Sequence, residues 1–209
     1  MRVSAIILAG GSSSRLGEDK SLVLLANKPL VQYVLDAVEK IADEKIVAIN
    51  SKAKIEVFRK TVDSDVKVVA DNPQYKVHSP LVGALTGFEK ACGEYSLLLS
   101  CDTPFISREV VTLLLELRVK KSAVVPRWPN GYIEPLQAVY HTQRALEAAE
   151  KTLEDERFSM RSMVEKLRGV RYVSTLVLQQ LDLELRTFFN VNTLLDLKKA
   201  EFLLKHGKR

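Results

Sequence analysis

The chain has 209 residues, a length that suits one α/β domain of moderate size. Its hydrophobic fraction of 46% is ordinary for a globular protein, and no apolar run approaches the roughly 18 residues of a membrane-spanning helix. The formal net charge is +5, yet the sequence holds no long basic block and no interleaving of aromatic and basic residues. Because a site for small polyanions also explains positive charge, we expect neither a nucleic-acid partner nor a membrane.

The two cysteines, Cys92 and Cys101, form no C-x-x-C pair and fit a reducing compartment. We predict a buried structural thiol for each. The first apolar run is too short, and too sharply followed by glycine and charge, to be a secretory signal. The sequence therefore predicts a cytoplasmic protein.

The chain opens with an apolar run, Val3 to Ala9, that ends in Gly10 and Gly11. Such a run is typical of a buried parallel strand, and glycines permit backbone conformations that are closed to other residues. Consecutive backbone N–H groups in the loop can hold phosphate oxygens, and Arg15 and Lys20 add positive charge. We therefore predict an anion-binding loop at the carboxyl end of this strand. The alternative is a glycine-rich turn with no ligand.

Predicted helices and strands then alternate as far as residue 126. Apolar residues at three- and four-residue steps indicate helices, and short apolar runs that end at polar residues indicate strands. The helices are expected over 30–41, 54–62, 81–92 and 108–119, and the strands over 45–49, 66–70, 95–100 and 123–126. This alternation predicts a parallel, doubly wound sheet, in which ligands bind at the carboxyl ends of the strands.

Several polar or glycine residues directly follow predicted strands, namely Gly10, Asn50, Asp71 and Asp102. They can line one crevice although they lie far apart in the sequence. Asp102 is the best metal candidate, because Mg²⁺ takes one or two protein carboxylates together with substrate phosphates and waters. The alternatives are turn formation for Asn50 and Asp71, and a helix or turn cap for Asp102.

The second half of the chain has a different character. A turn over 127–132 precedes a strand predicted over 133–140, and a short strand is expected over 170–174. Helices are expected over 142–153, 160–167 and 194–205. Since the sequence has no internal repeat, low-complexity segment or linker, we predict a single domain.

The first loop reads L-A-G-G-x-S-x-R-x-G-x-D-K, which fits neither the Walker A pattern nor the dinucleotide pattern G-x-G-x-x-G. It resembles the loop of nucleotidyltransferases that join a nucleoside monophosphate from an NTP to a phosphorylated acceptor. The most similar variant known to us belongs to the molybdenum cofactor guanylyltransferase family, which usually has Met at the position of Leu16. Four further segments resemble family motifs in the same order: Ser79-Pro-Leu-Val-Gly83, Cys101-Asp-Thr-Pro104, 132–140 and Phe189-Asn-Val-Asn-Thr193.

This resemblance implies a three-layer α/β/α fold with a Rossmann-like, mostly parallel sheet of the nucleotide-diphospho-sugar transferase type. It implies a Mg²⁺-dependent guanylyltransferase that moves GMP from GTP to the terminal phosphate of molybdopterin and releases pyrophosphate. Residues 1–126 would form the nucleotide- and metal-binding half, and residues 127–209 the acceptor-side half. The alternatives are a related enzyme that uses CTP, or a cobamide or sugar phosphate as acceptor, and a non-catalytic nucleotide-binding module. Transient contacts with other cofactor-assembly proteins are also implied.

The resemblance assigns roles by position in these motifs. Lys20 and Arg15 would face the triphosphate, and Asp102 with Asn192 would hold Mg²⁺. The nucleotide contacts would come from Leu8, Ala9, Gly10, Gly11, Ser12, Lys20, Asn50, Asp71, Gly83 and Asp102. The acceptor contacts would come from Glu134, Gln137, Asn190 and Asn192.

Other assignments stay open at the level of sequence. Asn190 and Asn192 can equally be helix caps, and the segment 158–167 with Arg161 is either an acceptor lid or, as we favour, an ordinary amphipathic helix. His78 is expected to be solvated. The chain also departs from the family pattern, with Ser79 in place of glycine and Leu194 in place of proline.

Overall fold

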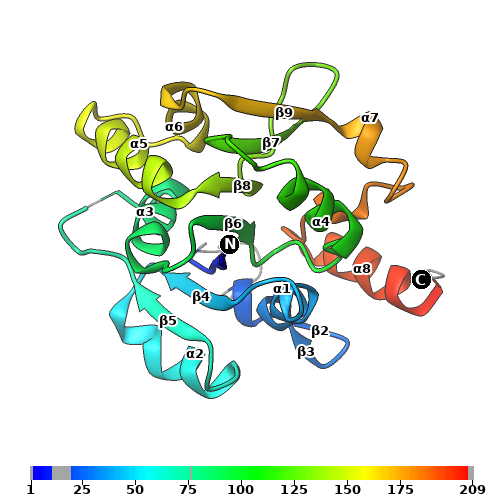
Figure 1. Ribbon diagram of the computed structural model, residues 1–209. Coiled ribbons are helices and arrows are strands. Elements are labelled where there is room, and N and C mark those ends of the chain that lie inside the picture. The colour runs from blue at the N-terminus through cyan, green and yellow to red at the C-terminus, as the bar shows by residue number, and fades with distance from the viewer. Residues whose placement is uncertain (1, 11–19, 76, 207–209) are drawn as a thin grey trace.

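The computed structural model describes residues 2–10, 20–75 and 77–206, and its centre is a seven-stranded sheet (Figure 1). The strand order is β5-β4-β1-β6-β8-β7-β9, and β8 alone of these seven runs antiparallel to its neighbours. The strands are β1 (Val3–Leu8), β4 (Glu44–Ile49), β5 (Lys67–Ala70), β6 (Tyr95–Ser100), β7 (Ala123–Arg127), β8 (Gln137–His141) and β9 (Val170–Ser174). The prediction of a mostly parallel α/β fold is confirmed.

Helices cover both faces of this sheet. The first core cluster holds α1 (Leu30–Val38), α2 (Ile55–Thr61) and α4 (Arg108–Glu116), and the second holds α3 (Pro80–Lys90), α5 (Thr142–Glu154) and α6 (Met160–Lys166). The residues of β1 alternate between the two clusters, with Ile7 in the first and Ile6 in the second. A strand buried on both faces is what its uninterrupted apolar sequence requires, and it gives the molecule three layers.

A smaller cluster joins the carboxyl-terminal helix to the region after the first loop. The ribbon of β2 (Leu24–Leu25) and β3 (Lys28–Pro29) packs with α8 (Leu194–His206) around Leu25, Val191 and Ala200. This contact brings the segment before α8 back to the carboxyl ends of β1 and β6. The ribbon and the short helix α7 (Thr175–Leu178) are not predicted by the sequence, because two- to four-residue elements carry too little periodicity.

Two expectations from the sequence are wrong. The strand predicted over 133–140 begins only at Gln137, and before it Ile133 makes a single isolated bridge to Arg127. Pro135 explains the difference, because proline has no N–H to donate to a neighbouring strand. Cys92 is exposed rather than buried, since it follows the end of α3 and its Sγ lies 3.9 Å from Lys67 Nζ, whereas Cys101 is buried. None of the helices in the described ranges is long and apolar enough to cross a membrane.

Helix α3 lies directly against β1 and carries the wall of the site described below. Ser79 caps it, with its Oγ accepting from the Val82 N–H, and Pro80 occupies the first turn, where a missing N–H costs nothing. A Cβ at Gly87 would lie only 2.3 Å from Ile6 Cγ2, so glycine sets the distance between helix and strand.

We expect Gly87→Ala to lower the free energy of unfolding by about 1–3 kcal/mol, because the new methyl group overpacks the buried Ile6. The matched control is Gly83→Ala in the same helix, where the nearest atom to a Cβ, Leu8 Cδ2, lies 3.4 Å away. That control should be neutral or stabilising by up to about 1 kcal/mol, since alanine favours helix. Urea unfolding of both variants checks this. Equal stability of the two would contradict the close packing at Gly87.

Candidate active site

A cavity of about 380 Å³ opens at the carboxyl ends of β1, β4 and β6 and beside the start of α3. We call it the Asp71 cavity. It is lined by seven of the residues that the resemblance assigns to nucleotide binding: Leu8, Gly10, Lys20, Asn50, Asp71, Gly83 and Asp102. Their convergence follows from the parallel sheet, which delivers the ends of neighbouring strands to one edge.

Of the other predicted nucleotide residues, Ala9 is described by the structure, and it does not line this cavity. Ala9 is buried behind the cavity wall, with its N–H donating to the Ala48 carbonyl and its carbonyl accepting from Ser21 Oγ. Gly11, Ser12 and Arg15 lie outside the described residues.

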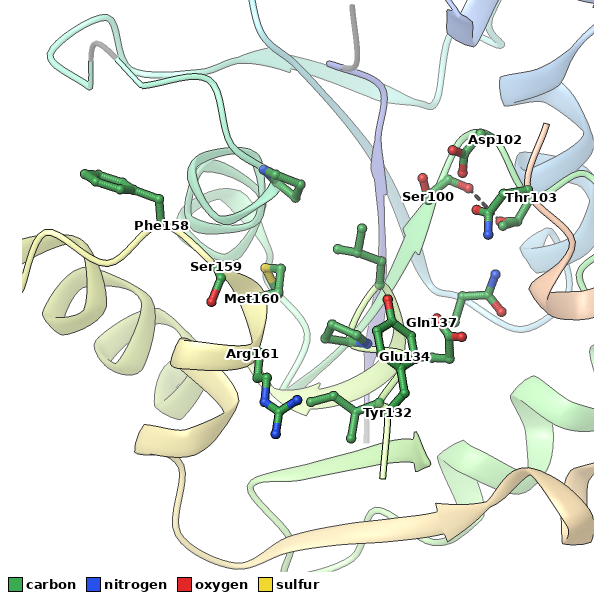
Figure 2. Close-up of a pocket in the computed structure, with 15 residues that line it drawn as sticks. Ser100, Asp102, Thr103, Tyr132, Glu134, Gln137, Phe158, Ser159, Met160 and Arg161 are labelled. Carbon is green, nitrogen blue, oxygen red and sulfur yellow. Dashed lines mark hydrogen bonds between the residues drawn. The ribbon is translucent and has the colours of Figure 1, made fainter. Parts of the chain in front are cut away.

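A second cavity of about 460 Å³ adjoins the first, and we call it the Glu134 cavity (Figure 2). Glu134, Gln137 and Asn190, which are predicted acceptor residues, line it. Figure 2 shows Asp102 and Ser100 toward one side of the cavity and Arg161 with Phe158 toward the other. The two cavities share four lining residues, Pro80, Ser100, Asp102 and Leu136. Asp102 therefore lies at the junction between them.

Lys20, Asp102 and Asn192 meet at this junction. The Lys20 ammonium donates to Asp102 Oδ2 and to Asn192 Oδ1, and the side chains of Lys20 and Asp102 are only 12% and 14% exposed. The other carboxylate oxygen, Asp102 Oδ1, is buried and accepts no hydrogen bond from the described residues. A carboxylate and an amide oxygen that face one cation are a donor set suited to a hard cation such as Mg²⁺.

The donor set is small. Within the described ranges no group of three His, Cys, Asp or Glu side chains could hold a metal ion. A metal held here would need further oxygens from substrate and water, which is the usual situation for Mg²⁺.

The segment before α8 orients Asn192. Thr193 Oγ1 accepts from the Asp196 N–H, and the Asp196 carboxylate accepts from the Thr193 N–H, which forms a capping box at the start of the helix. The Val191 N–H donates to the Asp102 carbonyl at 2.8 Å. Because Thr193 and Asp196 cap α8, the Asn192 side chain is left to contact Lys20.

Asn190 does not cap α8 either. Its Nδ2 donates to the Phe188 carbonyl at 3.1 Å, and it lines the Glu134 cavity. Neither asparagine side chain therefore caps α8, where Thr193 and Asp196 form the cap.

Asn50 and Gly10 fix the chain where it enters the first loop. Asn50 Nδ2 donates to the Gly10 carbonyl at 2.6 Å. A Cβ at Gly10 would lie 3.1 Å from Asn50 Cβ, which is tighter than ordinary contact, so this close approach favours glycine. Asn50 thus orients the backbone that leads into residues 11–19 as well as lining the Asp71 cavity.

Burial shifts the ionisation of Asp71. It raises the pKa of the Asp71 carboxyl to about 6, against the opposing effects of a hydrogen bond from Thr86 and the charge of His78. Asp71 Oδ1 is buried and has no hydrogen-bond partner among the described residues. A buried acceptor with an unused oxygen is suited to the N–H or O–H donors of a ligand, and such perturbed groups mark functional sites.

Glu134 is the corresponding carboxyl in the second cavity. Burial raises its pKa, while a hydrogen bond from Trp128 Nε1 to Glu134 Oε1 (2.7 Å) partly opposes the shift. Gln137 at the start of β8 is 7% exposed and lies near it in the cavity wall. A carboxylate and an amide here offer acceptors and donors to a polar ligand.

For some residues that line the two cavities, the sequence predicted another role or no role. His78 is exposed, as expected, but it lines the Asp71 cavity, and Phe158 and Arg161 line the Glu134 cavity although an ordinary helix was favoured. Tyr132 and Thr103 were not singled out as site residues, yet they line the Glu134 cavity. Both lie within segments that resemble family motifs, and this position is the one signal that could have found them.

Comparisons with known proteins identify the family of this chain. The model of the MobA-like NTP transferase domain matches residues 5–170. This chain belongs to that family. A relative from Natranaerobius thermophilus named probable molybdenum cofactor guanylyltransferase is 33% identical over 199 residues, which cover 95% of this chain and 94% of the relative. The molybdenum cofactor guanylyltransferase of Desulfosudis oleivorans is 32% identical over 99% of this chain and 98% of its own length.

A solved structure shares the fold of this MobA-like chain. Molybdopterin-guanine dinucleotide biosynthesis protein A from Archaeoglobus fulgidus superposes with a TM-score of 0.81 at 24% identity. The match covers 97% of this chain and 98% of that one. At this identity the likeness establishes the fold alone. Family membership makes the protein a nucleotidyltransferase and confirms the resemblance of the motifs.

We expect Asp71→Asn to raise the free energy of unfolding at pH 8 by about 1–3 kcal/mol. The pKa of Asp71 in the folded protein, about 6, lies above the usual 3.8. Asp71 therefore contributes fully to the free energy of unfolding below pH 3.8, where it is protonated, and this contribution is lost as the pH rises through 6. Urea unfolding at pH 5 and pH 8 measures the effect.

The matched control for this prediction is Asp155→Asn. Asp155 is exposed and bonded to Lys166, a contact that lowers the pKa of its carboxyl. This substitution should be neutral or slightly destabilising at pH 8. If Asp71→Asn behaved in the same way, the account of a costly buried carboxylate would be wrong.

Proposed function

We propose that this protein transfers GMP from GTP to the terminal phosphate of molybdopterin and releases pyrophosphate. The observation that carries the proposal is the meeting of two cavities at Asp102, one lined by predicted nucleotide residues and the other by predicted acceptor residues. A transferase of this kind must bring two anionic substrates together at one phosphorus atom. The names of the relatives supply the two substrates.

In this proposal GTP occupies the Asp71 cavity, with its base toward Leu8 and Asp71 and its phosphates toward Lys20. Asp71 accepts hydrogen bonds from the base or the ribose. Lys20 and Arg15 stabilise the negative charge that develops on the α-phosphate and on the departing pyrophosphate. Molybdopterin occupies the Glu134 cavity, with its phosphate near Asp102.

The acceptor phosphate attacks the α-phosphate of GTP in line, and the bond from the α-phosphate to the β-phosphate oxygen breaks. The attacking phosphate oxygen is already anionic at neutral pH, so the step needs no general base. The protein contributes mainly by holding both substrates in line and by fixed positive charge.

The residues present fit a magnesium ion, because Asp102 and Asn192 already direct two oxygens at a single cation. When bound there, Mg²⁺ would neutralise phosphate charge and help to orient the triphosphate. Since Lys20 uses the same two oxygens, its ammonium has to move toward the phosphates for both cations to be accommodated. Lys20 thus serves as a counter-ion of Asp102 before the substrates bind.

We infer a single nucleotidyltransferase domain with residues 1–126 as its nucleotide- and metal-binding half and residues 127–209 as its acceptor-side half. We also infer a cytoplasmic location, which Cys92 and Cys101 support because neither forms a disulfide. Transient contacts with other cofactor-assembly proteins are expected, because molybdopterin must be delivered and the product collected.

The test is an anaerobic assay with GTP, molybdopterin and Mg²⁺ that measures the guanine dinucleotide product and pyrophosphate. We expect product with the wild type, and a loss of kcat of about 100- to 1,000-fold in Lys20→Ala, comparable to the loss of one preorganised donor. Asp102→Asn should lose activity by a similar factor. Removing the metal with EDTA should stop turnover.

Lys28→Ala is the matched control for these variants. Lys28 also forms an ion pair with an aspartate, Asp36, but it lines neither of the two cavities. The control should keep wild-type kcat. Wild-type turnover in Lys20→Ala would refute the role of that lysine, and use of CTP in place of GTP would overturn the named nucleotide.

A further inference from the structure

Trp128 is the one tryptophan of the chain, and the proposed reaction gives it no role. It is partly buried in the turn that follows β7, and its side chain contacts Glu134 and Phe188. Its Nε1 donates to Glu134 Oε1 at 2.7 Å. Its ring meets that of Phe188 edge-on, with centroids 5.7 Å apart and planes at 61°. Trp128 therefore connects two segments that lie more than fifty residues apart in the sequence.

The backbone holds this turn in a fixed shape. The Trp128 N–H donates to the Tyr132 carbonyl at 2.8 Å, and the Gly131 N–H donates to the Trp128 carbonyl at 2.9 Å. Gly131 has a φ of +85°, which favours glycine at this position. The Glu134 N–H is bonded to the Pro126 carbonyl at 3.0 Å. Because hydrogen bonds fix the backbone at both Trp128 and Glu134, the indole N–H controls where the Glu134 side chain points.

Trp128 is the one group among the described residues that donates a hydrogen bond to the Glu134 carboxylate. An indole N–H only donates, so it fixes Oε1 and leaves Oε2 for other donors. Glu134 lines the second cavity, where Oε2 can accept from N–H groups of a ligand. Without the indole, the partly buried Glu134 carboxyl would lose the group that favours its charged form.

The other contact of Trp128, with Phe188, leads to a second residue that lines the same cavity. The Phe188 carbonyl accepts from Asn190 Nδ2 at 3.1 Å, and Asn190 lines the Glu134 cavity. Next along the chain, the Val191 N–H is bonded to the Asp102 carbonyl. A single ring thus supports Glu134 on one side and the Asn190 segment on the other.

We propose that Trp128 is a positioning residue for the acceptor: its indole aims Glu134 at the N–H donors of the acceptor's heterocyclic ring and supports the Asn190 wall through Phe188. The inference deepens the proposed function and rests on it, because it places the acceptor in the Glu134 cavity. It also names the chemistry recognised there, a ring whose N–H groups face a carboxylate. Asp102 and Lys20 act on the phosphates independently of this contact.

The first test is Trp128→Phe, which keeps an aromatic ring against Phe188 and removes the N–H. We expect KM for molybdopterin to rise about tenfold, the effect of losing one hydrogen bond to a charged group. The kcat and the KM for GTP should stay within twofold of the wild type. A general loss of structure would lower kcat as well, so this split distinguishes positioning from folding.

A double-mutant cycle shows whether Trp128 acts through Glu134. In a Glu134→Ala background the further change Trp128→Phe should alter KM by less than twofold, because its hydrogen-bond acceptor is gone. Tyr172→Phe is the matched control, since it removes a donor from a half-exposed ring on β9 that lines neither of the two cavities. An unchanged KM in Trp128→Phe, or an equal effect in both backgrounds, would overturn the proposal.

The wild-type protein gives a second measurement that does not depend on any variant folding. Because the chain has one tryptophan, its fluorescence reports on the surroundings of Trp128, which include this contact. We expect the emission to change as molybdopterin is added, with a midpoint equal to the dissociation constant from calorimetry. Calorimetric binding without a change in emission would overturn the inference and leave the proposed function intact. If molybdopterin binds and changes the emission but no nucleotide is transferred, the proposed reaction is wrong and the inference stands.

Discussion

The ion pair between Lys20 and Asp102, extended by Asn192, is the interaction on which the arrangement of the site depends. Its three members come from the end of the first loop, the end of β6 and the segment before α8. A carboxylate with an unpartnered buried oxygen is costly unless a cation compensates it, and Lys20 provides that cation. The contact therefore holds distant parts of the chain at the junction of the two cavities.

The pairing of the strands in the sheet creates this junction. Parallel pairing of β1 with β4 and β6 brings Gly10, Asn50 and Asp102 to one edge of the sheet. The antiparallel strand β8 then places the turn with Glu134 beside the same edge. Two carboxyl groups, Asp71 and Glu134, have pKa values raised by burial, one in each cavity. Each of these carboxyl groups destabilises the fold when it is ionised. Ionisable groups perturbed in this way are typical of ligand-binding sites.

Much of this could be predicted from the sequence because the signals were local. The apolar run before Gly10 and the polar residues after each later strand predicted the sheet and its ligand-binding edge. The same reasoning was wrong for the strand expected from residue 133. Pro135 has no N–H to donate, so regular pairing begins only at Gln137. Motif resemblance supplied Asn192, but its contact with Lys20 depends on the packing of α8 against β2, which no local pattern encodes.

Trp128 is the clearest case of a residue that the sequence could not explain. Its position in a turn-like segment gave no reason to connect it with Glu134 or with Phe188. The Phe188 contact exists only because the turn after β7 and the segment after α7 lie together in the fold, whereas Glu134 lies in the same loop as Trp128. Long-range contacts of this kind need the structure, whereas strand ends and helix caps are visible in the chain itself.

The most direct test of the account is thermal unfolding with GTP, CTP, ATP or UTP, each with and without Mg²⁺. A nucleotide at 100 times its dissociation constant stabilises the fold by about 2.7 kcal/mol, which is enough to raise the Tm by several degrees. The account predicts that GTP gives the largest shift and that Mg²⁺ increases it. A clean transition that no nucleotide shifts would contradict the account, because the cavity at the carboxyl ends of the strands would then bind no triphosphate.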